Sequence, residues 1–182
     1  MRHEADMTVS ASPAPRLWTA HGFRENTWKR VDQAEALTGN SELILPLQFF
    51  LSLEATLQEN LLPRCAVEVS PGEALDRLLP FLDRLPVVAL AFPAFNDGRS
   101  YSKAELLRSR FGYRGDIRAT GDVLIDQIPH MLRCGISSFE VKNETTLRRL
   151  EAGRRGGVPL HYQPSAAAPA GRGKYSWRRA SQ

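Results

Sequence analysis

The sequence predicts an α/β fold in which repeated βα units build a mostly parallel sheet of four to five strands. Short apolar runs, typical of buried strands, begin near residues 43, 65, 87, 116 and 137. The segments between these runs carry apolar residues at helical spacing. Strands that alternate with helices are joined by right-handed crossovers and pair in parallel. A chain of 182 residues accommodates one such domain, as a half-barrel or a small three-layer sandwich.

The first two βα units follow one another without a long connection. Residues 43–47 and 66–69 predict two buried strands, because each is a short apolar run bounded by polar residues or proline. Residues 48–59 and 70–82 predict the helices that follow these strands. Pro80 lies inside the second helix and interrupts or kinks it, since proline cannot donate a backbone hydrogen bond.

The third unit has the best-defined helix. Residues 87–92 form a continuous apolar run that predicts a buried strand. Ser102 and Glu105 have the spacing of a capping box, in which each side chain satisfies a backbone amide of the first helical turn. Gly112 supplies the left-handed residue that commonly ends a helix. The sequence therefore predicts a helix from Ser102 to Gly112.

The fourth unit is predicted from similar signals. Residues 116–120 and 138–141 predict short strands on either side of a helix. Asp122 is a favourable N-terminal cap for this helix and Gly135 is a favourable stop. Pro129 falls inside the predicted helix and is expected to bend it.

The two ends of the chain differ from its centre in composition. Residues 1–16 are polar and proline-containing and predict a disordered N-terminal tail. Residues 17–150 are expected to form the single α/β domain, which starts with a short hairpin that turns at residues 24–26. Residues 151–182 are rich in Arg, Gly, Ala and Pro and predict a basic, disordered C-terminal tail.

The charge of the chain is unevenly distributed. Residues 142–182 hold nine of the 24 Lys and Arg residues and two of the 20 Asp and Glu residues. Residues 1–141 therefore carry 15 basic and 18 acidic residues, and the net charge of +4 comes from the C-terminal part. A mildly acidic domain disfavours nucleic acid as a partner. The basic tail is expected to be a solvated segment.

Composition also limits the location and the cofactor chemistry. No apolar run approaches the roughly 18 residues of a membrane span, and residues 1–15 lack the apolar core of a secretory signal. We therefore expect a cytoplasmic protein that does not enter the membrane. Cys65 and Cys134 have no metal-ligand spacing and predict reduced, buried thiols. No phosphate-binding loop, dinucleotide fingerprint or metal motif is present, so the sequence names no cofactor.

Two junctions between a predicted strand end and a helix start carry the candidate site. Because parallel strands end at the same edge of a sheet, ligands of open α/β proteins bind at such junctions. Arginine side chains and helix N-terminal amides together favour a small oxyanion. The alternative is a structural network in which aspartates pair with the arginines. The predicted anion-binding residues are Arg99, Ser100, Ser102, Arg118, Thr120 and Gly121.

Asp97 and Asp122 are the candidates for acid–base catalysis at the same junctions. A carboxylate at a strand end can transfer protons if its surroundings tune its pKa. The alternative assigns Asp97 to a turn before Gly98 and Asp122 to helix capping. The sequence offers no adjacent histidine that would complete a proton-transfer pair.

Several linked segments of this chain match the pattern of a known family. They comprise residues 92–99, 101–102, 107–108, 115–124, 126–127 and 133–135. These segments resemble the bacterial family called domain of unknown function 934. The resemblance is dense over residues 86–141, looser over residues 43–85 and absent from both tails. The chain departs from the family pattern at residues 128–130. The family's signature positions correspond here to Asp97, Gly98, Arg99, Arg118, Gly121, Asp122 and Asp126.

The resemblance implies a role in sulfur metabolism. Members of the family are often described as oxidoreductases, and their genes lie near those of sulfite reductase and assimilatory sulfate reduction. The chain is accordingly expected to act in sulfate or sulfite assimilation, as an oxidoreductase or an accessory factor with a small-oxyanion pocket at the carboxyl ends of its strands. The expected partner is sulfite reductase or another sulfur-assimilation enzyme. The alternative function is a non-catalytic adaptor that docks on sulfite reductase or another partner protein.

Overall fold

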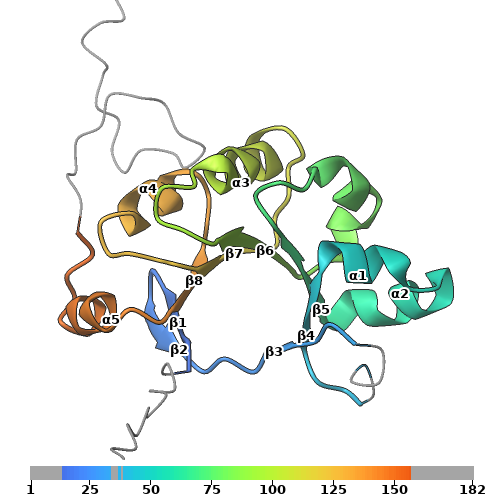
Figure 1. The fold of residues 1–182 in the computed structure, drawn as a ribbon, viewed down its shortest axis with the longest axis horizontal. Helices are drawn as coiled ribbons and strands as arrows, with labels where there is room; N and C mark the ends of the chain where they lie inside the picture. Colours follow the sequence, from blue (N-terminus) through green and yellow to red (C-terminus); the bar gives the residue numbers. More distant parts are fainter. Residues whose placement is uncertain (1–13, 34–36, 38, 157–182) are drawn as a thin grey trace, which may run out of the picture.

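The computed structural model describes residues 14–33, 37 and 39–156. Its centre is one sheet of eight strands, which Figure 1 shows curled into an open half-barrel. The order across the sheet is β2-β1-β8-β7-β6-β5-β4-β3. The strands are β1 (Arg16–Thr19), β2 (Gly22–Arg24), β3 (Lys29–Arg30), β4 (Leu43–Pro46), β5 (Cys65–Val69), β6 (Val87–Phe92), β7 (Asp116–Gly121) and β8 (Ser138–Val141).

The α/β class and the half-barrel alternative are confirmed, but the sheet is larger than predicted and mixed. Neighbouring strands from β3 to β8 pair in parallel, whereas β1 is antiparallel to both β8 and β2. The extra strands β1, β2 and β3 are two to four residues long. Strands this short give little periodic signal, and β8, one of the two partners of β1, lies more than 100 residues away in the sequence.

The helices that the structure describes cover the outer face of the curled sheet, and none of them lies on its inner face (Figure 1). Alternate strand residues such as Leu45, Val67, Leu90 and Phe139 are fully buried against these helices and form the main core. The helices are α1 (Leu47–Ser52), α2 (Ala55–Leu61), α3 (Arg99–Ser109), α4 (Ile128–Arg133) and α5 (Glu144–Glu151), with 3₁₀ helices η2 (Leu62–Arg64) and η3 (Leu75–Arg84).

The first two predicted helices have different forms in the structure. An extended residue, Leu53, divides the predicted helix at 48–59 into α1 and α2. In place of the helix predicted at 70–82, the structure has the 3₁₀ helix η3, which starts at Leu75 and contains Pro80. In a regular α-helix the proline ring also clashes with the carbonyl four residues before it, which disfavours the α form in this segment.

Helix α3 starts three residues earlier than predicted. Gly98 is its N-terminal cap and Arg99 its first residue, so Ser102 and Glu105 do not form the predicted capping box. The carboxylate of Asp97 accepts the backbone N–H of Arg99 at 3.2 Å and supplies the helix start. Gly112 has φ 63° and lies just beyond the helix, as predicted.

The N-terminal cap predicted for the fourth helix was also wrong. Helix α4 begins at Ile128 after Gln127, and Asp122 lies outside it. The backbone N–H of Asp122 donates instead to the carbonyl of Phe92 at 2.7 Å, which extends the pairing of β7 with β6. Pro129 occupies the first turn of α4, where its missing N–H removes no helical hydrogen bond, so it does not bend the helix.

The two ends of the described chain lie close to each other. Strand β1 starts at Arg16, and its hairpin with β2 turns at Ala20 and His21 rather than at residues 24–26. Near the other end, the guanidinium of Arg155 donates to the carbonyl of Ala20 at 2.7 Å. The disorder expected for residues 1–13 and 157–182 lies outside the described residues.

Candidate functional site

The inner face of the half-barrel is charged in its middle. Glu68, Ala89, Arg118 and Ser138 are partners in register across four neighbouring strands. Because strand side chains alternate, this row projects to the face opposite the helices. Together with neighbours two residues further along their strands and one arginine from β3, they form the interior cluster. It consists of Arg30, Glu68, Arg118, Thr120, Ser138 and Glu140.

Arg118 is the buried cation of the interior cluster. Its side chain is only 4 % exposed and lies 3.4 Å from the carboxylate of Asp116. Its Nε donates to the hydroxyl of Ser138 at 3.2 Å. The guanidinium also lies over the ring of Trp28, 5.3 Å from the ring centroid. These contacts compensate much of the cost of removing a charge from water.

Arg30 is the half-exposed cation of the cluster. It belongs to the edge strand β3, and four strands separate β3 from β8 in the sheet. Its guanidinium nevertheless reaches Glu140 on β8 at 2.7 Å and Glu68 on β5 at 3.0 Å. Burial lowers the pKa of Arg30, but the two carboxylates outweigh this effect and raise it overall. Arg30 thus links distant parts of the curled sheet by charge.

Glu140 has one carboxylate oxygen without a hydrogen bond. The side chain is 1 % exposed, and its Oε2 accepts from Arg30. Its Oε1 is buried and accepts no hydrogen bond from any residue that the structure describes. A guanidinium nitrogen of Arg118 lies 3.8 Å from this oxygen, which is beyond hydrogen-bond distance. Buried polar atoms without a partner are uncommon in folded proteins, and some of them mark functional sites.

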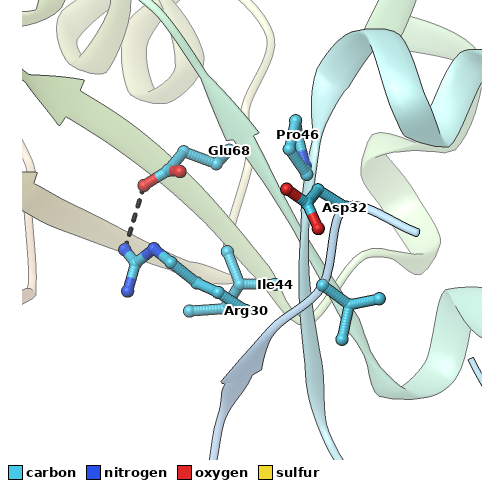
Figure 2. A pocket seen from close by; sticks show the side chains of 6 residues that line it. Arg30, Asp32, Ile44, Pro46 and Glu68 are labelled. Carbon is cyan, nitrogen blue, oxygen red and sulfur yellow. Dashed lines mark hydrogen bonds and ion pairs between the residues drawn. The ribbon is translucent and has the colours of Figure 1, made fainter. Parts of the chain in front are cut away.

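A cavity of about 190 Å³ opens beside the interior cluster, between the parallel strands β3, β4 and β5. Figure 2 shows Arg30 and Glu68 facing one another there, with Ile44 beside Arg30. Asp32 and Pro46 also line it, at the carboxyl ends of β3 and β4. Ligands of α/β barrels bind at this end of the strands. The cavity therefore gives a route from solvent to the charged interior.

The residues predicted to bind an anion lie in two separate environments. Arg118 and Thr120 belong to the interior cluster, where the hydroxyl of Thr120 donates to Glu68 at 2.6 Å. Arg99 lies at the start of α3 with its side chain 65 % exposed. Ser100 is buried and donates to the carbonyl of Ala91 at 2.7 Å. The first pair shares a network of carboxylates, whereas Arg99 faces solvent.

The remaining predicted site residues have local roles. Arg99 donates to both carboxylate oxygens of Asp97, and this pairing lowers the pKa of Asp97. A carboxylate with a lowered pKa is a weaker base. Ser102 is exposed within α3. Gly121 has φ 93°, and a Cβ there would overlap the carbonyl of Phe92, so this position favours glycine for structural reasons.

Sequence reasoning missed Arg30, Glu68 and Glu140. The two glutamates carried a usable signal, because an acidic residue within a short, otherwise apolar strand is rarely buried without a partner. Arg30 carried none, since β3 has two exposed residues and no apolar pattern. Its place in the cluster depends on the curvature of the whole sheet.

A second polar group lies on the helical side of the sheet. The Tyr101 ring stacks on His130 with centroids 4.6 Å apart, and the sulfur of Cys134 lies 3.9 Å from both ring nitrogens of His130. Burial and the charge of Arg133 lower the pKa of His130, whereas burial raises the pKa of Cys134. The thiol is therefore poorly suited to act as a thiolate. In the described ranges, no group of three or more His, Cys, Asp or Glu is placed to hold a metal ion.

Comparison with known proteins gives one family. Residues 66–172 match the family described as "Bacterial protein of unknown function (DUF934)". The match continues to residue 172. The resemblance described from the sequence, which ended at residue 141, therefore underestimated how far the family pattern extends toward the C-terminus. A search of curated proteins found no match. Of the helices that the structure describes, none has the length and apolar character of a membrane span. With more than half of its 182 residues matched, the chain belongs to the family of bacterial proteins of unknown function DUF934.

Proposed function

We propose that the protein binds a small polar molecule inside the half-barrel, through the interior cluster. The observation that carries this proposal is the buried Oε1 of Glu140, which accepts no hydrogen bond within the described residues. Leaving such an oxygen unpaired costs about 1–3 kcal/mol or more. A ligand that donates an N–H or O–H to this oxygen recovers that cost and binds at a defined position.

The charges around Glu140 favour a donor group over an oxyanion. Arg30 and Arg118 supply two positive charges, whereas Glu68, Asp116 and Glu140 supply three negative ones. The cavity adds a further carboxylate beside them. An oxyanion in this space meets an excess of like charge, and like charges at close range are unfavourable in a partly buried site. The interior therefore favours a neutral or cationic ligand that donates hydrogen bonds.

The proposal is tested by a thermal-shift screen of small amines, amino acids and sulfur-containing metabolites. A ligand that binds the folded state raises the unfolding midpoint in proportion to the logarithm of its concentration. We expect Glu140→Gln to lose this response, because it replaces one acceptor by an amide. Glu151→Gln, at an exposed ion pair with Arg16, is the matched control and should keep it. A response that Glu140→Gln retains would refute binding at the cluster.

We infer from family membership that the ligand belongs to sulfate or sulfite assimilation, where the protein acts as an accessory factor or an oxidoreductase. Thiol-based redox chemistry is the least favoured form, since burial raises the pKa of both Cys65 and Cys134. Growth of a deletion strain on sulfate, sulfite or cysteine as the sole sulfur source tests this role. Normal growth on all three would contradict it.

An adaptor function is the second candidate, and an exposed aromatic side chain favours it. Phe95 is 64 % exposed on the connection between β6 and α3. The amide of Gln127 donates to the carbonyl of Phe95 at 2.7 Å and fixes this connection. Exposed aromatic residues on fixed loops often anchor protein contacts. We expect Phe95→Ser to weaken binding to purified sulfite reductase, and Leu106→Ser, at another exposed apolar residue, to leave it unchanged.

A further inference from the structure

We infer that the ligand of the half-barrel carries a guanidinium or similarly planar cationic group, and that it takes the place of Arg30. This inference rests on the proposed binding function and specifies its ligand class. The structure already contains the interaction in question, because the guanidinium of Arg30 bridges Glu68 and Glu140. Arg30 is thus an internal occupant of a two-carboxylate clamp.

Both carboxylates of the clamp are on interior strands of the sheet. Glu68 lies on β5 and Glu140 on β8, and each of these strands is paired on both sides. The hydroxyl of Thr120 donates to Glu68 at 2.6 Å and helps to fix that carboxylate. The two Nη atoms of Arg30 donate to different carboxylates, at 2.7 and 3.0 Å. A planar fork of N–H donors suits this arrangement better than an ammonium group, which acts as a point charge.

Arg30 is the replaceable member of the network. It comes from a two-residue strand at the edge of the sheet, and its side chain is 44 % exposed. Arg118, by contrast, is 4 % exposed and belongs to the central strand β7. The cavity of about 190 Å³ adjoins Arg30 and Glu68, so a small ligand can approach the clamp from solvent.

The remaining Glu140 oxygen distinguishes a ligand from Arg30. Arg30 uses only Oε2 of Glu140 and leaves Oε1 without a hydrogen bond in the described part of the chain. A free guanidinium is not held by the backbone of β3 and can turn to donate to both oxygens, since bidentate contact with a carboxylate is its preferred geometry. The ligand therefore gains an interaction that Arg30 lacks, which favours the exchange.

The test is chemical rescue of the full-length Arg30→Ala variant with ethylguanidinium chloride. We expect the variant to melt at a lower temperature than wild type, and ethylguanidinium to restore at least half of the loss with a saturable dependence. Ethylammonium chloride and potassium chloride at equal ionic strength should restore much less. By calorimetry, Arg30→Ala should bind ethylguanidinium at least about tenfold more tightly than wild type does, because its internal competitor is absent.

Matched variants separate the clamp from a general effect of the cation. The two Nη atoms of Arg84 also donate to a carboxylate, that of Glu59, and the Arg84 side chain is 50 % exposed. Arg84→Ala is therefore the control variant, whose stability ethylguanidinium should not restore. Arg30→Ala combined with Glu140→Gln should also lose the rescue. If Arg30→Ala does not fold, Arg30→Gln replaces it in the same titrations.

The outcomes also separate this inference from the function on which it rests. Equal rescue of Arg84→Ala, or no saturable rescue of Arg30→Ala, would overturn the guanidinium inference. If wild type then still binds a screened ligand in a Glu140-dependent manner, the binding function stands and only the ligand class is wrong. If neither response depends on Glu140, both proposals fail.

Discussion

At the scale of single residues, Arg118 determines whether the interior cluster holds together. It contacts Asp116, Ser138 and Glu140 from the centre of β7, and it also covers Trp28. Each of these groups is oriented by a charge that is almost completely removed from solvent. Loss of that charge therefore affects several strands at once.

We predict that Arg118→Met is strongly destabilising. The substitution keeps apolar volume but leaves Asp116 without its cation and removes one of the two cations beside the buried Glu140. Breaking a buried ion pair from one side costs roughly 3–5 kcal/mol. Urea unfolding followed by circular dichroism measures the loss. Arg148→Met, at an exposed residue of α5, should change stability by less than about 0.5 kcal/mol. A similar small change for Arg118→Met would show that the cluster contributes little to stability.

Arg99 presents the opposite case, because it is exposed and its guanidinium pairs only two residues away, with Asp97. The oxyanion hypothesis for Arg99 makes a clear prediction. Arg99→Ala should fold and melt like wild type, since exposed ion pairs contribute little, and should lose any weak binding of sulfite, sulfate or phosphate. Calorimetric titration with each anion checks this. Equal anion binding by both proteins would remove Arg99 from the site.

At the scale of secondary structure elements, local signals were sufficient for the buried strands and insufficient for helix starts and edge strands. The apolar runs of β4 to β8 predicted five parallel strands correctly, because a strand buried on at least one face leaves a local pattern. The start of α3 depends on the side chain of Asp97, and the pairing of β1 with β8 joins distant residues. Local periodicity contains neither contact.

The candidate site divides in the same way. Arg118 and Thr120 were candidates because they belong to the predicted strand at 116–120, close to a predicted helix start. The convergence of Arg30 with Glu140 could not be predicted, since it requires the sheet to curl until β3 and β8 approach one another. Arg99 and Arg118, which lie near neighbouring predicted strand ends, are in separate environments: the first is exposed at the start of α3 and the second is buried in the interior cluster.

The close approach of β6 and β7 gives a prediction at this scale. Gly121→Ala should destabilise the protein by more than about 2 kcal/mol, because it combines a positive φ with overlap between the new Cβ and the carbonyl of Phe92. Gly112→Ala is the matched control: φ is also positive, but a Cβ there meets no atom within 4 Å. It should cost only about 1–2 kcal/mol. Equal losses in urea unfolding would show that the steric contact is unimportant.

At the scale of the whole molecule, the half-barrel has an apolar outer core and a charged inner surface with different physical demands. The outer core excludes water and contains ionisable side chains whose neutral form is favoured by burial, among them Cys65 and Tyr113. The inner surface keeps its charges in mutual contact and partly open to solvent. The response of the protein to alkaline pH should therefore originate in the outer core.

We predict that stability falls progressively as the pH rises above about 9. Burial raises the pKa of Cys65 from 9.0 to about 12 and, together with nearby Cys134 and Asp126, raises that of Tyr101 from 10.0 to about 12; burial likewise raises the pKa of Tyr113. A group whose pKa is higher in the folded state releases its proton first in the unfolded chain. Its stabilising contribution is complete below the unfolded pKa and is lost as pH approaches the folded value.

Cys65→Ala isolates the contribution of one of these groups. The variant should be less stable than wild type at pH 7, because it leaves a small cavity beneath β5, but its stability should decline less steeply between about pH 9 and 11. Urea midpoints measured across this range for both proteins give the two slopes. Parallel slopes would mean that the thiol titrates alike in the folded and unfolded chain, and hence that the core around Cys65 admits water.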